Sequence, residues 1–290
     1  MPEISRSEMA AEYGLTLSFL NSNKELRALF NKAVKQTWDP ARFQAAVRNT
    51  NWYKKTAEPW RQAQVLEKTD PATYEQRLAQ VRARVTMMMS EYGAKMSAKT
   101  FNRFAEQVFR QGMDDNQVRR HLAGFIQYRD GRLLGQAGQW EQEIRQHMRD
   151  MGVMWTDKAI KRSVSRMVQG TLTVQDIISQ VNETAKGKYS HLAKRIEQGE
   201  TLYDIAAPYM SEIGEILEIN PETLTVDNPL IKKALDYVPN GDKPGTHRTM
   251  TVSEFGRELR RDPRWKATDN AKQTASNVLR SLGESFGKSV

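Results

Sequence analysis

Apolar residues recur along this chain at the three- and four-residue spacing of amphipathic helices, and short turns separate the helical stretches. Three of these turns share one pattern: a helix is followed by Gln-Gly, then by capping-type residues, then by a second apolar helix. Glycine after the last periodic residue supplies the positive φ that ends a helix, and Asp or Thr beyond it caps the next one. The pattern lies at Val108–Asp114, Arg166–Thr173 and Arg195–Thr201.

A looser fourth copy runs from Ala33 to Pro40, with Asp39 as the expected N-cap and Pro40 at the first helical position. No part of the chain alternates apolar and polar residues as convincing β-strands do. The pattern therefore predicts an all-α fold in which multiple helical hairpins stack into an extended bundle, with little or no β structure. Such a chain usually presents surface rather than performing chemistry.

The strongest helix is expected after Asp70-Pro71, where apolar residues follow at spacings of four, three, four, three and four. That is a seam of nearly three heptads, which is typical either of the inward stripe of a bundle or of a coiled-coil or oligomer contact. Both interpretations stay open. As candidate interaction residues the seam offers Tyr74, Leu78, Val81, Val85, Met88 and Tyr92.

A second candidate contact is an aromatic-basic segment, a turn in which two aromatic residues are followed by two lysines and then by Pro59-Trp60, ahead of the helix expected after Asp70-Pro71. Core packing and helix capping are the competing explanation for any single one of these residues. The candidate residues are Trp52, Tyr53, Lys54, Lys55 and Trp60.

The amino-acid composition limits the shape, the chemistry and the location that can be expected of this chain. The chain has 290 residues, 39% of them hydrophobic, and a mean hydropathy of −0.70, which favours a thin helical body with much solvated surface. It has no cysteine, which excludes disulfides, thiolate metal sites and a cysteine nucleophile. No run approaches the roughly 18 apolar residues of a membrane span, and the first residues lack the apolar core of a signal peptide. We expect no stable membrane span, and a protein made and kept in the cytoplasm or in a particle assembled there.

The net charge of +9 is unevenly distributed. Residues 1–150 carry 24 Lys and Arg against 17 Asp and Glu, residues 151–238 carry 10 against 12, and residues 239–290 carry 10 against 6. The basic regions could contact nucleic acid. Because the bases are scattered among acids, solvated helix faces are the competing explanation.

The charge changes and the Pro- and Gly-rich stretch Pro239–Gly245 predict three regions. Residues 1–130 form an N-terminal helical region with a basic bias. Residues 131–238 form helical hairpins with an acidic stretch. Residues 239–290 hold the linker and C-terminal basic helices, of which the last, Asn270–Phe286, has one apolar face.

Motifs for catalysis and cofactor binding are missing. The histidines lie at positions without metal-ligand spacing, and the chain has no phosphate-binding loop, dinucleotide fingerprint or Gly-x-Ser-x-Gly elbow. We therefore predict no enzymatic activity, no catalytic residues, no cofactor and no metal. A carboxylate pair that degrades cell wall stays open, because sequence spacing does not reveal one.

One stretch resembles the LysM peptidoglycan-binding module. Glu197–Ala206 and Ile216–Pro221 are similar to that family's Gly-Asp-Thr-Leu phrase, Ile-Ala helix and later Leu-Asn-Pro. The resemblance implies a wall-binding protein and covers some 25 residues. The segments on either side, Tyr189–Ile196 and Leu230–Leu235, have helical patterns where LysM has β-strands.

Most of the chain resembles virion-associated proteins of tailed bacteriophages. The stretches that carry the resemblance are Tyr13–Leu26 with Arg48–Tyr53, Gln198–Tyr209 and Phe255–Trp265. It implies a structural protein of the virion, either a tail component or an internal, ejected one. Its partners would be other virion proteins, further copies of itself and possible DNA. Its location would be the virion, after synthesis in the host bacterial cytoplasm, and the resemblance carries no active-site residues over.

The alternative to a structural virion protein, from another functional class, is a nucleic-acid-binding protein of the helix-turn-helix type. Arg119 and Arg120 lie on the second helix of the first Gln-Gly hairpin. On that alternative they would contact backbone phosphates.

Overall fold

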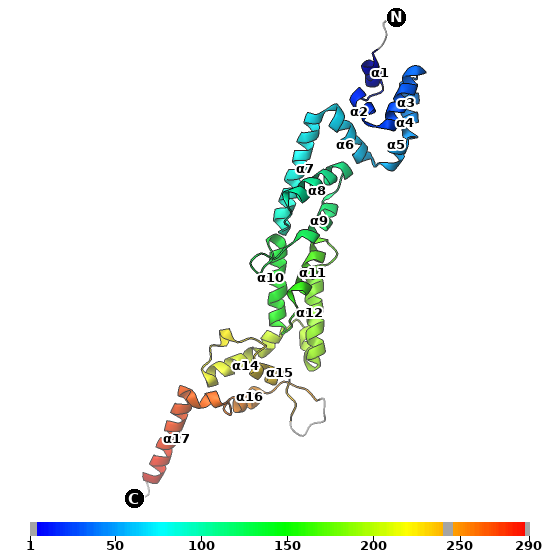
Figure 1. Cartoon of the computed structure of the whole chain (residues 1–290). Coiled ribbons are helices and arrows are strands. Elements are labelled where there is room, and N and C mark those ends of the chain that lie inside the picture. The colour runs from blue at the N-terminus through cyan, green and yellow to red at the C-terminus, as the bar shows by residue number, and fades with distance from the viewer. Residues whose placement is uncertain (1–4, 240–245, 288–290) are drawn as a thin grey trace. The chain divides into compact units, whose positions relative to one another are not determined.

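The computed structural model of the chain describes residues 5–239 and 246–287, which form 17 α-helices and four short 3-10 helices (Figure 1). These residues contain no β-strand, and their strand-like pairing is limited to three isolated bridges. The predicted all-α class with helical hairpins is therefore confirmed. Among the described helices, none is long and apolar enough to cross a membrane.

The chain divides into two compact units. The first comprises residues 1–139 and 165–171, and the second comprises residues 140–164 and 172–290. Two of the three boundaries between the units fall inside helices, because α10 (Gly135–Asp150) and α11 (Asp157–Val168) each contribute residues to both units. This division follows packing, whereas the three predicted regions follow charge and composition and stay a prediction. Most of the predicted linker, at 240–245, lies outside the described residues.

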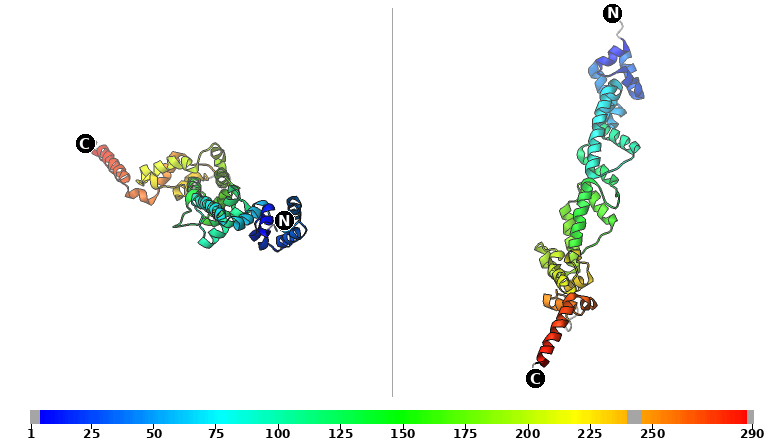
Figure 2. Two further views of the ribbon diagram at one scale, coloured as in Figure 1. Left: turned by 90° about the horizontal axis from the view of Figure 1, so that it is seen from above. Right: turned by 90° about the vertical axis from the view of Figure 1, so that its left-hand side faces the viewer.

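The N-terminal helices of the first unit enclose an aromatic core. Tyr13, Phe30 and Phe43 are buried with their rings in mutual contact, and a fully buried Phe contributes about 1.5–3 kcal/mol. The helices of this unit, which are blue to green in the two views of Figure 2, are α1 (Arg6–Glu12), α2 (Leu17–Ser22), α3 (Lys24–Lys35), α4 (Pro40–Arg48), α5 (Asn51–Lys55), α6 (Glu58–Thr69), α7 (Pro71–Tyr92), α8 (Ala98–Gln111), α9 (Asp115–Leu122) and η1 (Ala123–Phe125).

The heptad seam lies on α7 and faces the chain's own core. It packs against α6, α8 and α9, where its partners include Phe104, Val108 and Phe109. Five of its six side chains are therefore corrected from candidate interaction residues to core residues, since they offer a partner almost no surface, and Val81 packs at the edge of the same core. Tyr74, Leu78, Val85, Met88 and Tyr92 are buried and Val81 is half-buried.

The second unit is organised around α14, which packs against α15 and α16. The ring of Tyr209 meets the ring of Phe255 edge-on at 5.2 Å. Besides its parts of α10 and α11, the unit contains α12 (Val174–Lys188), η2 (Ser190–Leu192), α13 (Ala193–Glu197), α14 (Leu202–Leu217), η3 (Pro221–Thr223), α15 (Pro229–Leu235), α16 (Val252–Leu259), η4 (Pro263–Ala267) and α17 (Asp269–Gly287).

The three Gln-Gly turns have the predicted geometry. Their glycines have φ values of 60°, 76° and 97° and follow the ends of α8, α11 and α13. After each turn, an Asp or Thr side chain accepts a backbone N–H at the start of the next helix. The glycines are Gly112, Gly170 and Gly199, and the caps are Asp114, Thr173 and Thr201.

The looser fourth copy also folds as predicted. Asp39 accepts the backbone N–H of Arg42 at 2.8 Å, and Pro40 is the first residue of α4. Thr37 has a φ of 44° at the turn where the other copies have glycine.

Helix α14 runs unbroken from Leu202 to Leu217 and contains Pro208 in its interior. The proline removes one backbone donor. Apolar side chains on both sides of it are buried against α15 and α16, and this packing offsets the lost hydrogen bond.

Candidate functional site

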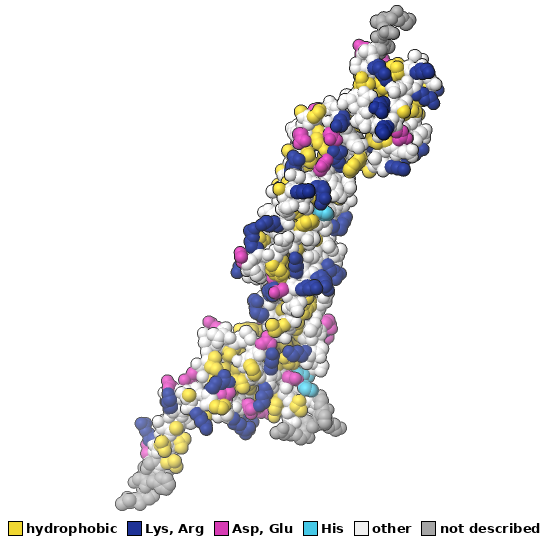
Figure 3. Space-filling view, in the orientation of Figure 1, with side chains coloured by type: hydrophobic (Ala, Val, Ile, Leu, Met, Phe, Trp, Pro, Cys, Tyr) yellow, Lys and Arg dark blue, Asp and Glu magenta, His cyan; other side chains and the backbone are white. Residues whose placement is uncertain are grey.

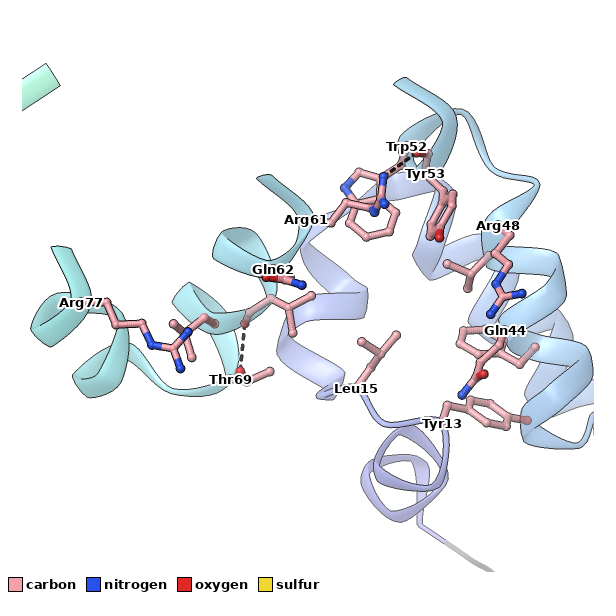
Figure 4. Close-up of a pocket in the computed structure, with 14 residues that line it drawn as sticks. Tyr13, Leu15, Gln44, Arg48, Trp52, Tyr53, Arg61, Gln62, Thr69 and Arg77 are labelled. Carbon is pink, nitrogen blue, oxygen red and sulfur yellow. Dashed lines mark hydrogen bonds between the residues drawn. The ribbon is translucent and has the colours of Figure 1, made fainter. Parts of the chain in front are cut away.

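A pocket of about 530 Å³ opens in the first unit among the end of α1 and helices α4 to α7 (Figure 4). Its wall contains Trp52 and Tyr53, two residues of the aromatic-basic segment. No single stretch of sequence builds it, because its other side chains come from four further elements. These include the apolar Leu15, Val47 and Val65, the amides Gln44 and Gln62, and the cations Arg48, Arg61 and Arg77.

A carboxylate on another helix fixes the start of α5. Glu25 on α3 accepts the backbone N–H groups of Asn51 at 2.8 Å and Trp52 at 3.0 Å. These hydrogen bonds lower the pKa of Glu25, so it stays charged at the positive end of α5. The Thr50 hydroxyl adds a cap by accepting the N–H of Tyr53. The two aromatic residues are thus held through their backbone.

Side-chain contacts then orient the two rings. The indole N–H of Trp52 donates to Gln64 at 2.8 Å, and its ring meets Phe19 edge-on. The Arg61 guanidinium lies 3.9 Å from the centre of the Tyr53 ring and donates to the carbonyl oxygens of Tyr53 and Thr56. Arg61 is therefore a fixed part of the wall, as Figure 4 shows.

Tyr13 closes the opposite wall. Its ring stacks on Phe43 with centres 4.3 Å apart, and its hydroxyl donates to the carbonyl oxygen of Trp38 at 2.7 Å. Burial, which is the main cause, raises the pKa of Tyr13 above its ordinary value. This wall is thus rigid and uncharged.

The charged side chains that line the pocket are all positive. They are Arg48, Arg61 and Arg77, and no Asp or Glu lines it. Arg48 and Arg77 are exposed and stand on opposite sides of the pocket, with Leu15 between them, in Figure 4. An apolar floor below a cationic rim attracts anions.

The rest of the aromatic-basic segment does not line this pocket. Lys54 and Lys55 are exposed in the last turn of α5. Trp60 is half-buried on α6, and the Arg110 guanidinium lies 5.4 Å from the centre of its ring. The segment predicted as one contact is thus divided among a pocket wall, an exposed helix end and a packed indole.

Arg119 is engaged within the first unit. Its Nε donates to the carbonyl oxygen of Val168 at 3.2 Å, and its guanidinium lies 5.5 Å from the centre of the Tyr92 ring. It is half-buried and braces the second Gln-Gly turn, and its assignment as a phosphate contact stays a prediction. Arg120 is exposed.

A second feature is the apolar face of α17. Val278, Leu279 and Leu282 are 53%, 70% and 48% exposed, and α17 (red) extends beyond η4 in Figures 1 and 2. Hydrophobic side chains gather on the face of α17 that Figure 3 shows. A groove of about 550 Å³ runs beside them and is lined also by Trp265. The sequence revealed the amphipathic pattern of this helix but not that its apolar face is uncovered.

The N-terminus of α17 is anchored to α14. Glu218 accepts the backbone N–H groups of Asp269 at 3.1 Å and Asn270 at 2.9 Å. The Asn270 amide donates to the carbonyl oxygen of Glu215 at 2.6 Å. The apolar face formed by Val278, Leu279 and Leu282 therefore lies on a helix whose first residues are held by side-chain hydrogen bonds.

The LysM-like stretch folds as α13 and α14, with α12 before it and α15 after it. The flanking β-strands that the resemblance implies are absent from the described residues. The peptidoglycan-binding alternative thus lacks its structural basis. Over the same residues, no group of three His, Asp or Glu side chains is placed to hold a metal ion.

No family model, no curated protein and no solved structure matches this chain.

Proposed function

We propose that this chain is a structural, interaction-type protein of a tailed-phage virion, a tail or internal component that works by packing helices against partner subunits, including further copies of itself. The observation that carries the proposal is the exposed apolar strip of α17, formed by Val278, Leu279 and Leu282. Large exposed apolar patches mark interaction sites, because water contact with them is unfavourable.

The spacing of the strip favours another helix as its partner. Ala275, Val278 and Leu282 follow one another at three and four residues, which is the spacing of a coiled-coil seam. Leu279 widens the seam on one side, and the groove beside Trp265 offers space for side chains of the partner helix.

The charges of α17 favour a second copy as the partner. The helix carries two acids and two bases, at Asp269, Lys272, Arg280 and Glu284. Because it is neutral as a whole, two copies can approach without net repulsion, whereas a strongly charged helix would need an oppositely charged partner.

The assignment to a virion rests on the resemblance of Tyr13–Leu26, Gln198–Tyr209 and Phe255–Trp265 to phage virion proteins. On this proposal the chain is made in the host bacterial cytoplasm and incorporated into the particle, where its basic N-terminal region can also meet DNA. The test is particle purification from the source bacterium. An antibody against the chain should detect it in the density-gradient fractions that contain phage particles, and detection only in the free-protein fractions would refute the virion assignment.

Self-association is tested separately, by size exclusion with in-line light scattering at low and high salt. We expect a salt-stable dimer or larger assembly, because apolar contacts are not screened. Leu279→Glu should give the monomer mass. The matched control is Met154→Glu, which changes another exposed apolar side chain, 83% exposed, and should leave the mass unchanged. A monomeric parent chain, or a Leu279→Glu variant of parental mass, would remove the second copy as the partner.

A further inference from the structure

The pocket of the first unit has the size and composition of a small-molecule site. Its volume of about 530 Å³ lies within the range of roughly 300–1,000 Å³ that such sites occupy. Apolar side chains dominate its floor, and a few polar groups converge on it from separate helices. This combination differs from the α17 strip, which is apolar along one face of a helix and suited to a partner helix.

The walls are ordered before any ligand arrives. Trp52 is fixed by its hydrogen bond to Gln64, and Tyr13 is fixed by its hydrogen bond to Trp38. Arg61 is held by the carbonyl oxygens of Tyr53 and Thr56 and by the Tyr53 ring. A ligand therefore meets aromatic surfaces that lose little further freedom on binding.

The positive charges that line the pocket favour a negatively charged ligand. Arg48, Arg61 and Arg77 approach from α4, α6 and α7, and no carboxylate stands among the lining residues. The neighbouring Asp70 is not among the lining residues, but its carboxylate, which accepts the hydroxyl and backbone N–H of Thr73 at the start of α7, stays charged and interacts with Arg77. The net positive charge of the pocket therefore comes mainly from Arg48 and Arg61.

We propose that this pocket binds a small apolar anion, with an aliphatic or aromatic body and a carboxylate, sulfonate or phosphate head. The body lies over Leu15, Val47 and Val65 against the ring of Trp52. The head lies at the rim, where Arg48 or Arg77 donates hydrogen bonds to its oxygens. This site is independent of the function proposed for α17.

The first measurement uses the full chain and two fluorescent probes, the anion 1-anilinonaphthalene-8-sulfonate and the neutral N-phenyl-1-naphthylamine. We expect the double variant Arg48→Gln, Arg77→Gln to bind the anionic dye about tenfold more weakly and the neutral dye unchanged. Arg27→Gln is the matched control, because Arg27 is an exposed arginine of the same unit outside the pocket. Equal loss in the control and the double variant would overturn the proposal.

A second variant separates this pocket from the α17 strip, which can also adsorb dye. Val65→Trp fills the floor and should abolish binding of both dyes at the pocket, whereas Leu279→Glu should leave that binding intact. Far-UV circular dichroism and the thermal midpoint show whether Val65→Trp still folds. A folded Val65→Trp variant that binds both dyes like the parent contradicts the assigned place.

Competition identifies the head group. Octanoate and octyl phosphate should displace the anionic dye, and the more effective of the two shows whether a carboxylate or a phosphate is preferred. Octanol, of the same chain length and without charge, should displace it at least tenfold less well. If octanol competes as well as octanoate, the cationic rim does not select the ligand and the proposal is wrong.

Discussion

At the scale of single residues, one phenol links two segments of the second unit. Tyr209 on α14 is 5% exposed, and its hydroxyl donates to the carbonyl oxygen of Met250, 41 residues further along the chain. Tyr209→Phe keeps the ring but leaves that buried carbonyl without its donor. We expect a loss of about 1–2 kcal/mol in the free energy of unfolding, measured by urea denaturation.

The control for this variant lies on the same helix. Tyr203 is 41% exposed, so Tyr203→Phe should change the free energy of unfolding by less than about 0.5 kcal/mol.

The pH dependence of stability gives a second readout of the role of Tyr209. Burial raises the pKa of Tyr209 above 10.0, so its contribution is complete below pH 10 and is lost as the pH rises through the folded-state pKa. Tyr209→Phe should therefore lose less stability than the parent chain between neutral and strongly alkaline pH, and parallel curves would contradict this role.

At the scale of elements, the proline within α14 carries a cost that packing offsets. Pro208 is exposed and lies in the interior of the helix, where it removes the backbone donor for the turn before it. Pro208→Ala restores that donor, although alanine also makes the unfolded chain more flexible. We expect the free energy of unfolding to rise by about 1–2 kcal/mol, measured by the same urea denaturation.

The matched change is Pro40→Ala at the first position of α4, where the backbone N–H has no helical acceptor. It should leave stability unchanged or slightly lower. If both substitutions raised stability equally, the interior position of Pro208 would not be the cause.

Helix ends were predictable because they are encoded locally. A glycine with positive φ and a capping side chain a few residues later are visible in the sequence, and Gly112 with Asp114 shows both in the structure. Helix α14 continues through Pro208 because burial on both sides of the proline outweighs one hydrogen bond, and this burial depends on helices distant in the sequence. The burial of the α7 seam was not predictable for the same reason. The heptad pattern shows that the helix has an apolar face, but it does not show what covers that face.

The pocket was predictable only in part. Trp52 and Tyr53 were candidates because aromatic and basic residues adjoin them in the sequence. Arg61 and Arg77 had no local signal, because they reach the pocket from α6 and α7 after those helices pack. A site assembled from side chains of separate elements requires the tertiary structure to be seen.

At the scale of the whole molecule, the two units have separate cores, such as the cluster around Phe30 in the first and the packing of α14 on α16 in the second. Chains with more than one such unit commonly unfold in more than one step. We expect two transitions in scanning calorimetry. Leu78→Ala, which removes a buried side chain of the first unit and costs about 2–5 kcal/mol, should lower one transition. Tyr209→Phe should lower the other.

A single transition with equal calorimetric and van't Hoff enthalpies would show that the two units unfold as one. If two transitions are seen and Leu78→Ala, which changes only the first unit, shifts both of them, the stability of the second unit depends on that of the first.

The hairpin arrangement has a consequence for synthesis on the ribosome. Helices α7 and α8 contact one another and together span only Pro71–Gln111. At about 5–20 residues per second, such a hairpin emerges within roughly 2–8 seconds, and contacts of short sequence separation form fast. Early hairpins can therefore pack while the later ones are still being translated. Helix α17 follows all the other described helices in the chain, so its apolar strip reaches solvent only when those helices have already had time to fold.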